Sequence, residues 1–291
     1  MEFWSVLVPV LKITFYAASL GTTGTILFLL HFKHHLSSEN FVYCSNLIKN
    51  SSLLGIGTSA ASFFSIAGNM GGDLKSAFDI IMLGLAFETS SGFSALLALA
   101  GFTFILFWNE VKSFKQKIFA IFGMVAVYLS FSITGHSTLD GYLTQILVLI
   151  HLVGVSFWLG SFLPFINMCQ SNKNNNLPVV AKLFGLFALV YVAAMTLAGI
   201  VFAYVLLGAF SPLIETAYGN TLLIKLVLVL SLMLLGAINK FKLVPMLHSS
   251  QSLATKKLQQ SIKLEITLAI LVLTVTSLLT TSINLPAKTL T

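Results

Sequence analysis

Residues 143–168 have the sequence LTQILVLIHLVGVSFWLGSFLPFINM, which contains one histidine and no other ionisable side chain. About 20 consecutive apolar residues are enough for a helix to cross a bilayer, so this stretch predicts a transmembrane helix. The rest of the chain is similar, since 57% of its 291 residues are hydrophobic and only 9% are charged. Membrane β-barrels use short strands of alternating polarity, whereas the apolar runs here are continuous. The sequence therefore predicts an all-α fold, a polytopic transmembrane helical bundle.

The bundle is expected to have about eight spans within a single transmembrane domain that covers residues 1–291. The expected spans are approximately 4–31, 50–70, 90–108, 118–135, 143–168, 178–208, 219–244 and 258–283. An apolar stretch at 76–86, which carries Asp79 and is followed by Glu88, precedes the third span. Irregular backbone at membrane depth is tolerated only inside protein or along a cavity. We therefore expect a half-helix or a bent start to the third span.

The loop charges predict the orientation of the chain. All 16 basic residues are lysines, and the formal net charge is +7. Most loop lysines lie in every second connection, namely 32–49, 109–117, 169–177 and 245–257. Lysine-rich loops stay in the cytoplasm, so both chain ends are expected outside. Because the positive charge is spread over these loops, we expect no nucleic acid as a partner. The apolar spans predict the lipid bilayer as a partner.

Two histidines lie at or near the outer half of neighbouring spans. His136 ends an apolar run as Thr134-Gly135-His136-Ser137, and His151 lies roughly 13 Å into the next span at about 1.5 Å per residue. Only residues 137–142 join these spans, so they are expected to be antiparallel neighbours. Ionisable groups at this depth are rare and often functional, and neutral imidazole binds transition metals. We expect both to meet at an outward-facing metal site; the alternative is that each hydrogen-bonds a nearby carbonyl group.

A carboxylate and three thioethers are further candidate metal ligands. Two histidines with a thioether or a carboxylate would suit copper, and Glu88, Met70 and Met82 lie near the outer side, whereas Met195 lies mid-span. The alternatives are an interfacial carboxylate for Glu88 and apolar packing for the methionines. The run His31–His35, at the inner end of the first span, is either a metal exit station or a solvated loop.

Three residues are expected to support the site. Trp158 falls on the helix face of His151, seven residues further on. Lys225 and Glu265 lie within spans, and a mid-span glutamate needs a partner or a neutralising proton. The sequence leaves two hypotheses open for Glu265, a structural bridge to Lys225 or Asn239 and an ion relay.

The order of several motifs resembles that of the copper resistance protein D (CopD/PcoD) family. These motifs are Thr134–Ser137, His151-Leu152, Phe157–Gly160, Leu163-Pro164, Tyr218-Gly219, Leu222–Leu226, Gly236–Lys240, Pro245, Leu264-Glu265 and Pro286. The resemblance covers roughly residues 130–290, and the first 120 residues match mainly in hydropathy and span count. The Asn-Arg of many relatives is Asn239-Lys240 here, so the role of that cation is not carried over.

The resemblance implies an eight-span protein of the bacterial inner membrane with periplasmic termini. It also implies copper movement from the periplasm toward the cytoplasm, with a separate periplasmic copper-binding protein of the copper resistance C type as a partner. We expect a transporter and no enzyme. The chain has no Walker A sequence, so ATP is not expected to drive transport directly, and the membrane potential favours cation entry by about 2.3 kcal/mol per charge per 100 mV. The alternatives are a membrane redox protein that binds haem b through its histidines and a copper-binding membrane subunit that transports nothing.

Overall fold

A computed structural model describes residues 2–107, 114–134, 141–171, 176–209 and 211–283. These residues form helices and no strand, which confirms the all-α prediction. The long helices are α1 (Glu2–Phe32), α2 (Ser38–Gly71), α4 (Ser90–Leu106), α5 (Phe114–Ser132), α6 (Tyr142–Leu159), α8 (Leu177–Leu207), α10 (Ala217–Ile238) and α12 (Gln251–Thr281). The short elements are η1 (Lys33–His35), η2 (Ser76–Phe78), α3 (Ile80–Glu88), α7 (Phe162–Gln170), α9 (Pro212–Glu215), η4 (Asn239–Leu243) and α11 (Val244–Ser249).

Most of the long helices are suited to a bilayer. In the described parts of the chain, six helical segments are long and apolar enough to cross a membrane, and a seventh is added if α3 and α4 form one bent span. The apolar part of α5, Ile118–Ser132, is shorter. Each of the eight predicted spans overlaps at least one helix, and the fifth is divided between α6 and α7. The count of eight transmembrane crossings stays a prediction.

The second span is predicted to start at residue 50, whereas the helix that contains it begins earlier in the chain. Helix α2 begins at Ser38, because the Ser37 hydroxyl caps it by accepting a hydrogen bond from the Asn40 N–H at 3.2 Å. The first turns of α2 are polar, and hydropathy alone does not detect a helix that continues beyond an apolar run.

The bent start of the third span is confirmed. Helix α3 lies at 89° to α4. Asp79 begins α3, since its Oδ1 accepts from the backbone N–H groups of Ile81 and Met82, both at 3.0 Å. Thr89 begins α4 in the same way by accepting from the Gly92 N–H at 2.9 Å. Helix capping of this kind explains why Asp79 lies in an apolar stretch.

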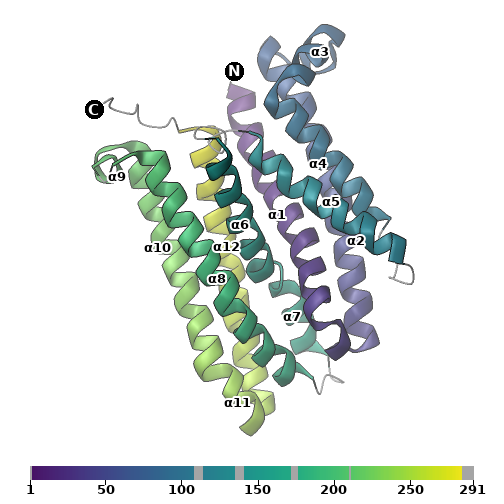
Figure 1. Cartoon of the computed structure of the whole chain (residues 1–291), viewed down its shortest axis with the longest axis vertical. Helices are drawn as coiled ribbons and strands as arrows, with labels where there is room; N and C mark the ends of the chain where they lie inside the picture. Colours follow the sequence, from purple (N-terminus) through teal and green to yellow (C-terminus); the bar gives the residue numbers. More distant parts are fainter. Residues whose placement is uncertain (1, 108–113, 135–140, 172–175, 210, 284–291) are drawn as a thin grey trace.

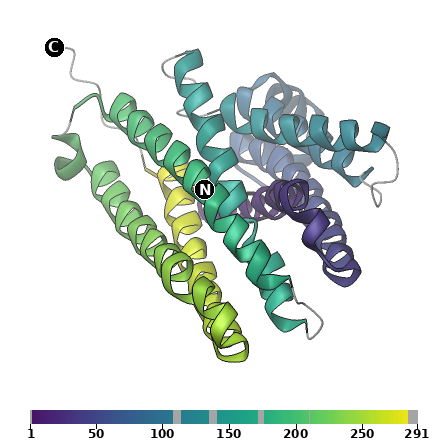
Figure 2. The same cartoon turned by 60° about the horizontal axis from the view of Figure 1, so that its bottom comes forward.

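The bundle has two sides that meet at α1 and α6 (Figure 1). On one side, α2 packs against α1 and α4, and α4 packs against α5; on the other, α8 packs against α6, and α10 against α12. The turned view in Figure 2 shows the same grouping. Helix α1 begins and α12 ends at the same end of the bundle, as expected for an even number of spans.

Helices α1 and α6 cross at a pair of glycines. The Cα atom of Gly160 lies 2.6 Å from the position that a Cβ atom on Gly24 would occupy, so neither residue has room for a side chain. Beside the crossing, the Thr23 hydroxyl donates to the Ser156 hydroxyl at 3.1 Å. Small residues allow this close approach of membrane helices. The crossing fixes the position of α6, which carries His151.

Candidate metal site and the cavity beside it

His151 is held in one orientation by α8. Its Nδ1 atom lies 2.9 Å from the backbone oxygen of Met195. A carbonyl oxygen can only accept, so Nδ1 carries the proton and the lone pair lies on Nε2. Gly199 leaves room for the ring, because a Cβ atom there would lie 3.2 Å from Nδ1. Within the described chain, Nε2 has no hydrogen-bond partner. Metal-binding histidines typically show this arrangement, with one ring nitrogen donating to a carbonyl group.

Met195 lies beside His151, but the contact is made by its backbone. Its side chain is 4% exposed and packs against Gly154 of α6, where a Cβ atom would lie 2.6 Å from that of Met195. His136 falls at 135–140, outside the described residues. The predicted convergence of His136 and His151 therefore stays a prediction.

The candidate ligands at the outer end lie on different elements from His151. Glu88 is an exposed residue at the end of α3, which packs against η2, α2 and α4. Met70 is 48% exposed at the end of α2. Met82 lies beside the next residue of this helix, because a Cβ atom on Gly71 would lie 3.7 Å from Met82 Cγ. Figure 1 shows α3 at the upper corner, apart from α6 and α8. In the described ranges, no three His, Cys, Asp or Glu side chains form a metal-binding group, so the third ligand stays a prediction.

Lys225, one of the three residues expected to support the site, acts on His151 through its charge. The two side chains belong to α10 and α6 and are close enough to interact electrostatically. Both residues lie about 12–14 Å from the start of their helices, counted at ~1.5 Å per residue. A cation beside a candidate metal ligand opposes the binding of a metal cation.

The sequence did not indicate that His31 packs inside the bundle. The run His31–His35 suggested either a metal exit station or a solvated loop. Its Nδ1 donates to the Leu27 oxygen at 2.8 Å, and its Nε2 lies 3.4 Å from the Tyr191 hydroxyl. The ring is 4.8 Å from that of Phe187. Tyr191 is one turn from Met195 on α8, so both histidines contact the same stretch of this helix.

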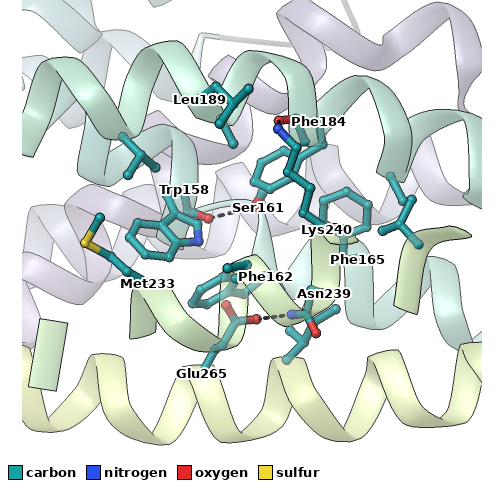
Figure 3. A pocket seen from close by; sticks show the side chains of 18 of the residues that line it. Trp158, Ser161, Phe162, Phe165, Phe184, Leu189, Met233, Asn239, Lys240 and Glu265 are labelled. Carbon is teal, nitrogen blue, oxygen red and sulfur yellow. Dashed lines mark hydrogen bonds between the residues drawn. The ribbon is translucent and has the colours of Figure 1, made fainter. Parts of the chain in front are cut away.

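Glu265 lies in a cavity of about 550 Å³ between α6, α7, α8, α10 and α12 (Figure 3). It is 2% exposed, and its Oε2 accepts from Asn239 Nδ2 at 2.9 Å. The predicted bridge to Asn239 is therefore present. Trp158, 6% exposed, lines the same cavity, and Lys240 Nζ donates to the Gly185 oxygen at 2.7 Å.

The helix widens where it carries Asn239. Residues Asn239–Leu243 form a π-helical turn, η4, just before Pro245. Proline has no N–H group, and its ring would collide with the carbonyl group four residues earlier in a regular α-helix. The wider turn relieves this collision and directs Asn239 at Glu265. Such π-turns are frequent at functional sites.

Replacing Asn239 with leucine is expected to destabilise the folded protein by about 1–3 kcal/mol, because the buried carboxyl group of Glu265 loses its donor. Thermal unfolding in detergent measures this loss. The double variant N239L/E265L, which removes both polar groups, should recover part of the stability. A double variant as unstable as the sum of the two single variants would contradict the coupling.

The fold and these residues define a class: a polytopic helical membrane protein with a buried carboxyl group and a histidine inside its bundle. Residues 1–146 match the family described as copper resistance protein D-like, N-terminal domain, and residues 178–279 match copper resistance protein D. The chain therefore belongs to the copper resistance protein D family.

One relative with a curated description is the inner membrane protein YebZ of Escherichia coli (strain K12), which is 27% identical over 195 residues. The match covers 64% of this chain and 65% of the relative, so the chain spans slightly less than two thirds of that protein's length. No solved structure matches the chain.

Proposed function

We propose that this protein moves copper across the bacterial inner membrane, from the periplasm to the cytoplasm. Membership of the copper resistance protein D family supports copper as the transported ion. The name of its relative supports the inner membrane. Eight apolar helical segments and the alternation of lysine-rich connections support eight spans with periplasmic termini.

The single observation that carries the proposal is the hydrogen bond that decides which ring nitrogen of His151 carries the proton. The Met195 carbonyl group holds the proton on Nδ1 and leaves Nε2 free to bind a metal inside the bundle. Copper would arrive at the outer side, where His136, Glu88, Met70 and Met82 are the proposed ligands, and would bind to His151 with Met195 nearby. A separate periplasmic copper-binding protein of the copper resistance C type would deliver it.

The route inward would follow α8. His151 contacts Met195 on this helix, and His31 contacts Tyr191 one turn further in. These contacts are about 6 Å apart along the helix axis at 1.5 Å per residue. A route along α8 accounts for the position of His31, for which the sequence left two alternatives, a metal exit station and a solvated loop.

Copper content of cells tests the proposal. Cells that produce the protein should accumulate more copper than cells without it, and H151A should lose most of the difference because the Nε2 atom of His151, which is free for the metal, is removed. H248A is the matched control, since His248 is an exposed residue near the end of α11. Equal copper content in cells with wild-type protein and with H151A would overturn the proposal.

Two purified-protein measurements separate the other functions. Uptake by liposomes that contain the protein distinguishes a transporter from a copper-binding subunit, which would bind copper without moving it. An absorption spectrum distinguishes both from a haem protein, because a Soret band requires haem.

A further inference from the structure

The cavity next to Glu265 opens sideways from the bundle. Its volume of about 550 Å³ is within the range of ordinary small-molecule pockets. Three residues on its rim are largely exposed, namely Leu189, Leu197 and Phe241. These residues belong to α8 and η4 and lie on the outer surface of the helices, so the cavity is open toward the bilayer. A ligand could enter it without passing through water.

The wall of the cavity is aromatic. Trp158, Phe162, Phe165 and Phe184 line it, and Figure 3 shows them around the same space. Flat rings pack favourably against aromatic side chains in stacked or edge-on arrangements. This wall favours a planar ring over a flexible acyl chain.

A hydrogen-bond donor and an acceptor without partners lie side by side in this cavity. Oε1 of Glu265 has no hydrogen-bond partner among the residues that the structure describes, although the residue is 2% exposed. The same holds for the indole N–H of Trp158. A Cβ atom on Gly236 would lie 3.3 Å from Trp158 Cζ2 and 3.7 Å from Glu265 Oε1. Gly236 therefore keeps open the gap between the indole and the carboxyl group.

A hydroxyl group fits this gap, because it can donate to Glu265 and accept from Trp158 at once. Asn239 is ten residues before the end of α11, about 15 Å along the helix at 1.5 Å per residue. The head group of a phospholipid stays at the membrane surface, so its acyl chains would bring no polar atom to this depth. The ligand must carry its hydroxyl group into the apolar interior.

We propose that this cavity binds a lipid-soluble hydroquinone, a planar aromatic ring with hydroxyl groups and an apolar body, which enters from the bilayer between α8 and α10. One hydroxyl group donates to Glu265 Oε1 and accepts from the Trp158 indole N–H, and the ring packs against Phe162 and its aromatic neighbours. The proposal concerns binding and does not depend on copper transport.

Binding of tetramethylhydroquinone to the purified full-length protein in detergent tests it. Under reducing conditions, equilibrium dialysis against protein-free micelles should show saturable binding near one molecule per protein. G236L should weaken this binding at least tenfold, because its side chain fills the gap between Trp158 and Glu265. W158F, which keeps a ring but loses the N–H group, should weaken it less.

Two controls make the result decisive. G57L adds the same side chain to α2 where no atom lies within 4 Å of the new Cβ atom, and should bind like wild type. The dimethyl ether of the same hydroquinone keeps the ring and loses the hydroxyl hydrogens, and should bind at least tenfold more weakly. The proposed recognition of a hydroxyl group at this cavity would be wrong if the ether bound as tightly as the hydroquinone. It would also be wrong if folded G236L bound the hydroquinone as tightly as the wild type.

Discussion

Replacing Gly24 with leucine is expected to leave almost no folded protein. A Cβ atom at this position would overlap the backbone oxygen of Ser156 and would lie 2.6 Å from the Cα atom of Gly160. Both neighbours are backbone atoms of the α6 region, so they cannot rotate away as a side chain could. Overpacking typically costs about 1–3 kcal/mol, and we expect a loss above that range here. Even G24A should be strongly destabilised.

Size-exclusion chromatography of detergent-solubilised protein measures this prediction, as the fraction of monodisperse material and its melting temperature. G57L is again the matched control, because the new side chain meets open space on the surface of α2. A melting temperature for G24A equal to that of wild type would mean that α1 and α6 do not cross as closely as the glycines indicate.

The apolar runs were enough to predict the helices, because a membrane helix must be apolar over the thickness of the bilayer. Asp79 and Glu88 were also enough to predict the bent start of the third span, since a charged residue in an apolar run needs a structural reason. The expected span 50–70 did not indicate that helix α2 extends back to Ser38. Its first turns are polar, and their helical structure depends on the cap at Ser37 rather than on hydropathy.

The site was less predictable, because it depends on which helices pack together. The bridge from Glu265 to Asn239 could be expected, since a mid-span carboxyl group needs a partner and few polar residues are available. A hydrogen bond from His151 to a nearby carbonyl group was one of the two hypotheses, but the sequence could not indicate that this carbonyl group belongs to Met195, because backbone groups leave no signal in the sequence. For His31 the sequence left open a metal exit station and a solvated loop, because Lys33 and two further histidines follow it. The helix continues through Phe32, and the His31 ring packs against Tyr191.

Replacing Lys225 is expected to raise the affinity of the protein for copper, and this prediction rests on the proposed copper site. Two unit charges about 4 Å apart interact by about 4 kcal/mol at an effective dielectric constant of 20, and this energy falls in inverse proportion to their distance. The positive charge of Lys225, which acts on His151, therefore weakens copper binding there. K225L removes the charge and keeps an apolar side chain, and unlike methionine it adds no thioether that could bind copper. It should raise the copper affinity of the purified protein about 10- to 100-fold, which corresponds to ~1.4–2.8 kcal/mol.

Competition with a Cu(I) chelator measures this affinity. K12L is the matched control, because Lys12 lies in α1 over the ring of Tyr16, at 5.8 Å from its centroid. The same charge is lost there without a change near His151. In the H151A background, K225L should have no effect, since the ligand that the charge opposes is absent. A gain of affinity in K225L that persists without His151, or that K12L reproduces, would mean that Lys225 acts through the overall charge of the protein. A gain confined to K225L with His151 intact would place the copper ion near these two residues and would identify Lys225 as the group that keeps copper from binding there too tightly to be released.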